Sequence, residues 1–190
     1  MINSVLRKRA LITGGSGGIG SAICRQLASD GFEVIVHANR KLEAAQALAG
    51  EIVAAGGHAQ ALAFDITDPV ATAQALESLL EQGPIQVVVN NAGIHDDAIF
   101  PGMQLRQWQH VIDVSLNGFF HVTQPLMMPM IRTRLGRVIN ITSVAALAGN
   151  RGPGNYPART GAPPAAPQAP ALRVRRPPRP LPASAPGPPP

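Results

Sequence analysis

The stretch "RALITGGSGGIG", residues 9–20, decides the fold class. An apolar run leads into a cluster of glycines and then into a helical pattern, which predicts a strand, a tight turn and a helix. Glycines let the backbone approach a pyrophosphate, and the start of a helix offers N–H donors and a partial positive charge. The stretch therefore predicts a dinucleotide-binding turn made by Thr13, Gly14, Ser16, Gly18, Ile19 and Gly20.

Two other classes of protein have similar glycine turns, but the rest of this sequence lacks the residues that they require. The loop of nucleotide triphosphatases ends in Lys followed by Ser or Thr, and no such pair follows Gly20. The segment "GGSGG", residues 14–18, also fits the nucleophile turn of serine hydrolases, which needs a later carboxylate and histidine. The last of these are Asp113 and His121, both ahead of the fifth predicted strand. A serine-hydrolase triad is therefore excluded.

Short apolar runs alternate with amphipathic stretches as far as residue 145, which predicts an α/β fold with a doubly wound, Rossmann-like parallel sheet. Asp68 is expected to cap the third helix, with Pro69 in its first turn. The fourth helix is expected over residues 104–128, with Pro125 kinking or ending it. The five strands are expected at 9–15, 33–38, 59–66, 85–93 and 137–143, and the first three helices at 21–32, 40–57 and 68–83.

The composition changes at about residue 157. Residues 157–190 contain 13 of the 19 prolines of the chain and no acidic residue, so we expect a disordered tail after a domain over 1–156. Five arginines in this tail account for the whole net charge of +5, which argues against a nucleic-acid surface on the domain. The fold is then truncated after about its fifth strand.

The remaining composition favours a cytoplasmic protein. The single cysteine, Cys24, excludes an internal disulfide and is expected in the core, as is Trp108. No signal peptide or membrane-spanning run is found in the sequence. The group His95, Asp96 and Asp97 has no second cluster at ligand spacing, so no metal site is predicted and a loop beside the substrate is favoured.

The end of the second strand, "VIVHANRK" (residues 34–41), bears on the choice of cofactor. No acid is present there to bind a ribose 2′-hydroxyl, while Asn39, Arg40 and Lys41, with His37 nearby, supply donors and cations. This set favours a 2′-phosphate and hence NADP(H). The alternative is that Arg40 and Lys41 simply begin a solvated helix.

The chain resembles the short-chain dehydrogenase/reductase family over about residues 7–156. The resemblance rests on "TGGSGGIG" (13–20), "FDITD" (64–68), "NNAG" (90–93), "RVINITS" (137–143) and "GNRGPGNY" (149–156), in the order and spacing of the family. The subgroup that it resembles is the bacterial 3-oxoacyl-[acyl-carrier-protein] reductases. The resemblance implies reduction of a 3-oxoacyl thioester with NADPH, and homo-oligomers in intact members.

The resemblance also implies roles for single residues. Asp65 and Ile66 would border the adenine, and Asn90, Ala92 and Gly93 would support the sheet and the cofactor ribose. Ser143 would hydrogen-bond the substrate carbonyl and Tyr156 would deliver the proton. Arg134 lies near a position that the family uses to dock the acidic carrier protein; the alternative is a solvated surface charge.

The chain departs from the family pattern at Thr160, at Ser115, which can still bind water, and in the family's later elements, which cannot be read in residues 157–190. A Lys one helical turn after the tyrosine lowers its pKa and holds the ribose, but Thr160 stands there and carries no charge. Ser115 occupies the place of an Asn that holds a proton-relay water, and Asn117 faces elsewhere. The change of composition after Tyr156 suggests translation in a shifted reading frame.

Three functions therefore stay open at this point. The first is an NADPH-dependent reductase with impaired activity. The second is a catalytically dead nucleotide-binding module that pairs with an intact homologue. The third is an interaction protein whose Arg/Pro-rich tail binds a partner or nucleic acid.

Overall fold

A five-stranded parallel sheet forms the centre of the computed structural model, which describes residues 7–94 and 100–142. The strand order is β3-β2-β1-β4-β5, so the chain reverses direction across the sheet between β1 and β4. Ligands of open parallel sheets bind at the carboxyl ends of the strands beside such a switch point. The strands are β1 (Arg9–Ile12), β2 (Glu33–Ala38), β3 (His58–Ala63), β4 (Val87–Asn90) and β5 (Arg137–Asn140).

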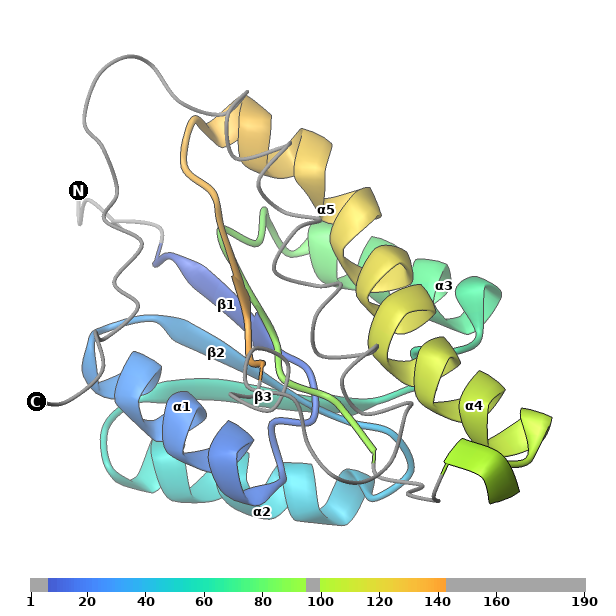
Figure 1. Ribbon diagram of the computed structural model, residues 1–190. Helices are drawn as coiled ribbons and strands as arrows, with labels where there is room; N and C mark the ends of the chain where they lie inside the picture. The colour runs from blue at the N-terminus through green and yellow to red at the C-terminus, as the bar shows by residue number, and fades with distance from the viewer. Residues whose placement is uncertain (1–6, 95–99, 143–190) are drawn as a thin grey trace, which may run out of the picture.

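Helices cover both faces of this sheet (Figure 1). The helices α1 (Gly18–Ser29) and α2 (Leu42–Ala54) lie on one face, and α3 (Pro69–Glu81) and α5 (Gly118–Thr133) on the other. A hydrophobic core lies on each face of the sheet. Successive residues of β1 pack in these two cores alternately, because side chains along a strand point to opposite faces. Ala10 and Ile12 pack in the first core and Leu11 in the second. The predicted doubly wound architecture is confirmed for the described residues.

The helix after β4 differs from the prediction. It begins as α4 (Leu105–Ile112), passes through a π-helical segment η2 (Asp113–Asn117) and continues as α5 to Thr133. Pro125 lies inside α5, so the helix does not end there, and a kink at Pro125 stays a prediction. Val122, Leu126 and Met130 are buried at four-residue spacing against the sheet, and this packing outweighs the lost hydrogen bond.

The start of α3 agrees with the sequence. The carboxylate of Asp68 accepts hydrogen bonds from the backbone N–H groups of Val70 and Ala71, and Pro69 occupies the first helical position. Cys24 is fully buried, as predicted, whereas Trp108 is only partly buried. In the part that the structure describes, no helix combines the length and the apolar character that crossing a bilayer requires.

Candidate functional site

The turn between β1 and α1 requires glycine at two positions. Gly14 has a φ of 62°, in the left-handed region that residues with a side chain rarely adopt. A Cβ on Gly20 would collide with the carbonyl oxygen of Gly14. A Cβ on Gly18, in contrast, would meet no atom within 4 Å, so this glycine faces open space. The turn is packed on its protein side and open on its outer side.

The open side of the turn is the beginning of α1. The first N–H groups of an α-helix have no partner within the helix, and no side chain caps them at Gly17. Ser16 lies half-buried in the turn, and Ile19 is 64% exposed. Unpaired N–H groups and the helix dipole favour an anion at this place.

Residues after β4 hold the turn from the other side of the switch point. The hydroxyl of Thr13 donates to the carbonyl of Val89 and accepts the N–H groups of Asn91 and Ala92, at 3.0 Å each. The side-chain amide of Asn91 donates to the carbonyls of Thr13 and Gly14, at 3.0 and 3.1 Å. Sequence reasoning missed Asn91, although the "NNAG" motif contains it. Gly93 follows and is exposed.

The polar residues at the end of β2 differ in their exposure to solvent. Asn39, Arg40 and Lys41 are exposed and precede α2. His37 is only 1% exposed, and its ring binds the backbone, so it is not one of the exposed donors. Its neighbours in β2 are buried on both faces of the sheet. The side chain of His37 therefore points into the protein interior on either face. Within the described residues, Arg40 makes no hydrogen bond or salt bridge.

The predicted adenine-side residues follow β3. One carboxylate oxygen of Asp65 accepts from the N–H and the hydroxyl of Thr67, at 2.9 and 2.7 Å. Partial burial alone would raise the pKa of Asp65, but these hydrogen bonds and the nearby Arg40 and His110 outweigh it, so this pKa lies below its usual value. Ile66 is buried against Gly118, where a Cβ would collide with the isoleucine side chain.

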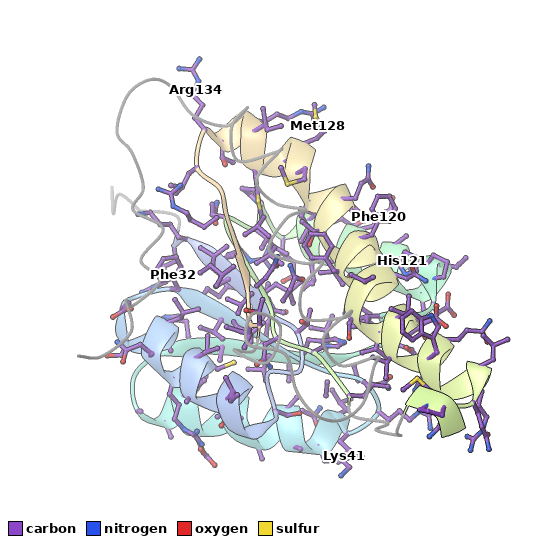
Figure 2. The ribbon with its side chains drawn as sticks, viewed as in Figure 1. Phe32, Lys41, Phe120, His121, Met128 and Arg134 are labelled. Atoms are coloured by element: carbon purple, nitrogen blue, oxygen red, sulfur yellow. The ribbon has the colours of Figure 1, made fainter. Side chains whose placement is uncertain are left out.

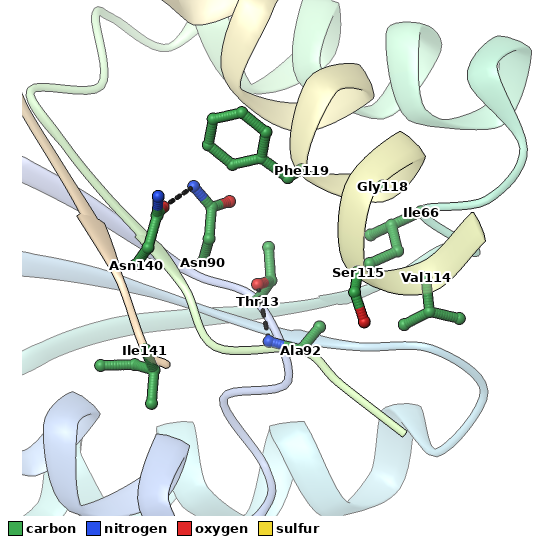
Figure 3. A pocket seen from close by; sticks show the side chains of 10 residues that line it. All are labelled: Thr13, Ile66, Asn90, Ala92, Val114, Ser115, Gly118, Phe119, Asn140 and Ile141. Atoms are coloured by element: carbon green, nitrogen blue, oxygen red, sulfur yellow. Dashed lines mark hydrogen bonds between the residues drawn. The ribbon is translucent and has the colours of Figure 1, made fainter. Parts of the chain in front are cut away.

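A small pocket lies where α5 passes the carboxyl ends of β4 and β5 (Figure 3). Its volume is about 40 Å³, and Thr13, Asn90, Ala92 and Ser115 contribute to its wall. The Ser115 hydroxyl is buried and has no hydrogen-bond partner in the part of the chain that the structure describes. A cavity of this size next to an unpaired hydroxyl has room for a bound water.

Ser115 owes its position to the π-helical segment, and Asn90 to hydrogen bonds across the sheet. π-Helical turns inside α-helices occur often at functional sites, and η2 carries both Val114 and Ser115 into the wall of the pocket. The side chain of Asn117, by contrast, is exposed and donates to Asp113. The amide of Asn90 donates to the Thr123 hydroxyl and to the Asn140 side-chain oxygen, which joins β4 to α5 and β5.

Several predicted residues do not come together in the described structure. Ser143, Tyr156 and Thr160 lie outside the described residues, as do His95–Asp97. Arg134 ends α5 with a φ of 55° and precedes β5, at the opposite end of the strand from the pocket. Figure 2 places it far from Lys41, which follows the carboxyl end of β2. The side chain of Arg134 therefore does not contribute to the pocket of its own chain.

Comparisons with known proteins agree with this geometry. The short chain dehydrogenase family matches residues 8–162. The chain is 43% identical over 150 residues to the 3-oxoacyl-[acyl-carrier-protein] reductase FabG of Aggregatibacter actinomycetemcomitans, covering 78% of this chain and 62% of that protein. It is 41% identical over 158 residues to the acetoacetyl-CoA reductase of an Acinetobacter species, covering 80% of this chain and 62% of that protein.

A solved structure has the same arrangement. The gluconate 5-dehydrogenase of Burkholderia cenocepacia, in complex with NADP and tartrate, superposes with a TM-score of 0.82 at 30% identity, covering 87% of this chain and 65% of that one. The described chain thus has the fold, the glycine turn at the switch point and the sequence of one family. It belongs to the short chain dehydrogenases.

Proposed function

We propose that the chain binds NADP(H) and descends from enzymes that reduce a 3-oxoacyl thioester to the 3-hydroxyacyl form. The observation that carries the proposal is the turn after β1, where an uncapped helix start faces open space at Gly18. A pyrophosphate fits there because backbone N–H groups can bind it and no side chain stands in the way. When bound, the dinucleotide supplies the hydride.

The preference for the phosphorylated dinucleotide rests on the exposed residues after β2. Arg40 and Asn39 can bind a 2′-phosphate, and no carboxylate stands at the carboxyl end of β2, residues 37–41, to bind a ribose hydroxyl. We expect Arg40→Ala to weaken NADPH binding about tenfold and to leave NADH binding nearly unchanged, because a charge-assisted contact is worth roughly 1.5–3 kcal/mol. Equal losses for both dinucleotides would contradict the assignment.

The substrate class rests on the relatives, two of which are named for reduction of 3-oxoacyl and acetoacetyl groups on a carrier protein or coenzyme A. Arg132, Arg134 and Arg137 give the end of α5 and the start of β5 an exposed positive surface that suits an acidic carrier. Because this surface lies away from the pocket, a carrier docked there would serve the site of another copy of the chain.

In the proposed reaction, the residues of this chain orient the carbonyl and move a proton. The Ser115 hydroxyl would hold a water in the pocket, and Ser143 and Tyr156 would act as the family resemblance implies. Thr160 supplies no positive charge, so it does not lower the pKa of the tyrosine as a Lys at this position would. Loss of that partner lowers general-acid catalysis by about 10² to 10⁴.

The second candidate is a nucleotide-binding module without catalysis, and the uncharged Thr160 favours it. One experiment separates the two candidates. NADPH binding is measured by calorimetry, and turnover is followed by the loss of nicotinamide absorbance with a 3-oxoacyl thioester. We expect binding with slow turnover. Binding without turnover would favour the module, and an absence of binding would overturn both candidates.

A further inference from the structure

The side chain of His37 is buried between the two turns of the proposed dinucleotide site. The backbone N–H of Gly14 donates to its Nδ1 at 3.1 Å. Its Nε2 lies 2.9 Å from the carbonyl oxygen of Phe64. Since an N–H faces Nδ1 and a carbonyl faces Nε2, the partners require a neutral ring with its hydrogen on Nε2. One imidazole therefore links the turn after β1 to the segment after β3.

We propose that His37 is a positioning residue, which fixes the pyrophosphate turn and the adenine-side segment relative to one another. This inference rests on the proposed function, because it concerns how the same site is held ready for NADP(H). It differs from the role proposed for Asn39 and Arg40, which would bind the 2′-phosphate directly.

On the pyrophosphate side, the backbone of Gly14 is held at both its N–H and its carbonyl group. His37 binds its N–H, while the side chain of Asn91 and the N–H of Gly17 both donate to its carbonyl, at 3.1 Å each. Gly14 has a positive φ, and a change in its backbone angles would redirect the N–H groups that follow at the start of α1. The His37 contact therefore bears on how the anion site is oriented.

On the adenine side, the segment Phe64–Thr67 is held from two elements. The His37 ring bonds the Phe64 carbonyl and packs on the Phe64 ring, with centroids 4.3 Å apart. Nδ1 of His121, on α5, lies 2.9 Å from the carbonyl oxygen of Ile66. These contacts come just before and just after Asp65, so they set where its carboxylate stands.

The electrostatics of the ring support this role. Burial lowers the pKa of His37 to about 4, even though the Phe64 carbonyl and Asp65 favour the charged form. The ring is therefore neutral near pH 7. A second proton would place an N–H against the N–H of Gly14 and break that contact.

Three variants separate the two contacts. In His37→Asn, the side-chain oxygen can replace Nδ1 and keep the Gly14 contact. In His37→Gln, the side-chain nitrogen can replace Nε2 and keep the Phe64 contact. His37→Leu keeps neither, and His58→Gln, at an exposed histidine at the start of β3, is the matched control. The probes are NADPH and 2′,5′-ADP, which carries the adenosine end but lacks the pyrophosphate bridge.

We expect His37→Gln to bind NADPH about tenfold more weakly and 2′,5′-ADP within about threefold of the wild type, since a tenfold change corresponds to about 1.4 kcal/mol, which is in the range for one hydrogen bond. His37→Asn should weaken both ligands, His37→Leu should weaken NADPH most, and His58→Gln should weaken neither. Equal binding of NADPH by all variants would overturn the positioning role, and so would a His37→Gln variant that loses as much affinity for 2′,5′-ADP as for NADPH.

A measurement on the wild type keeps the inference testable if the variants do not fold. Nitrogen NMR of the His37 ring should show an unprotonated Nδ1 and a protonated Nε2, and the Gly14 amide should shift when NADPH binds. The opposite tautomer, or a Gly14 amide unaffected by NADPH, would contradict the inference. A wild-type chain that binds no dinucleotide would overturn the proposed function, whereas binding with a failed histidine test would overturn only this inference.

Discussion

The turn after β1 and the pocket beside β5 both lie at the carboxyl ends of the strands. They differ in how many of their polar groups have hydrogen-bond partners. In the turn, Thr13 and Asn91 bond each other: the backbone N–H of Asn91 donates to the Thr13 hydroxyl, and the Asn91 side-chain amide donates to the Thr13 carbonyl. Around β5, the Ser115 hydroxyl has no partner in the described part of the chain, and Ile139 and Ile141 are 43% and 38% exposed. The strand β5 itself pairs with β4 alone among the described strands.

This difference separates the two tasks of a dehydrogenase. The nucleotide-binding side is held by contacts among residues 7–94, joined on its adenine side by His121 and Gly118 of α5. On the side proposed for catalysis, the structure describes the pocket and Ser115, whereas Ser143 and Tyr156 lie outside the described residues. We therefore expect nucleotide binding to be more robust than turnover.

The largest expected effect comes from filling the tight side of the turn. Gly20→Ala places a Cβ against the Gly14 carbonyl, so we expect the free energy of unfolding to fall by more than about 3 kcal/mol. The matched control is Gly50→Ala, on an exposed part of α2 with no atom near the new Cβ, which should gain about 0.5–1 kcal/mol. Urea denaturation of both variants measures the difference, and equal stabilities would break the comparison.

Acid should destabilise the nucleotide-binding side through His37. The pKa falls from 6.5 to about 4 on folding, so the unfolded chain binds the extra proton first. The contribution of His37 is complete above about pH 6.5 and is lost as the pH falls toward 4, a loss of about 3 kcal/mol. Unfolding curves across this range should show the slope in the wild type and lack it in His37→Leu. An unchanged slope in the variant would show that another group is responsible.

Removing one polar group from each region sharpens the comparison further. Asn91→Ala leaves the Thr13 and Gly14 carbonyls without that donor, so we expect a loss of about 2 kcal/mol. Ser115→Ala removes a hydroxyl that has no protein partner among the described residues, so the free energy of unfolding should change by less than about 0.5 kcal/mol. Thermal and urea unfolding test both, and a larger effect of Ser115→Ala would reverse the assignment.

The smallest expected effect lies at the end of α5. Arg134 adopts a left-handed conformation that glycine accepts without strain, so Arg134→Gly should gain about 0.5–1 kcal/mol. Arg132→Gly, inside the last turn of the helix, should lose a similar amount. If Arg134→Gly is destabilised instead, its side chain makes contacts that outweigh the backbone strain.

Much of the fold could be predicted because its signals are local. The glycine turn, the Asp68 cap and the alternation of strands and helices follow from neighbouring residues. The passage of α5 through Pro125 could not, because burial of Val122, Leu126 and Met130 against distant strands decides it.

The site was predictable to a similar degree. Its glycines and the "NNAG" segment were found, but the inward direction of His37 and the bonds of Asn91 depend on how β1, β2 and β4 meet in the sheet. An imidazole at a strand end has the same sequence signature whether it points to solvent or to a backbone turn. Only the burial of both faces of β2 distinguishes the two directions.

The central claim is that the open side of the turn after β1 binds the pyrophosphate of a dinucleotide, and Gly18 tests it most directly. A Cβ at this position meets no protein atom, so Gly18→Ala should fold as stably as the wild type. It would stand where the pyrophosphate approaches, so NADPH affinity measured by calorimetry should fall at least about tenfold, while Gly50→Ala binds as the wild type does. Wild-type affinity in a folded Gly18→Ala variant would contradict the account.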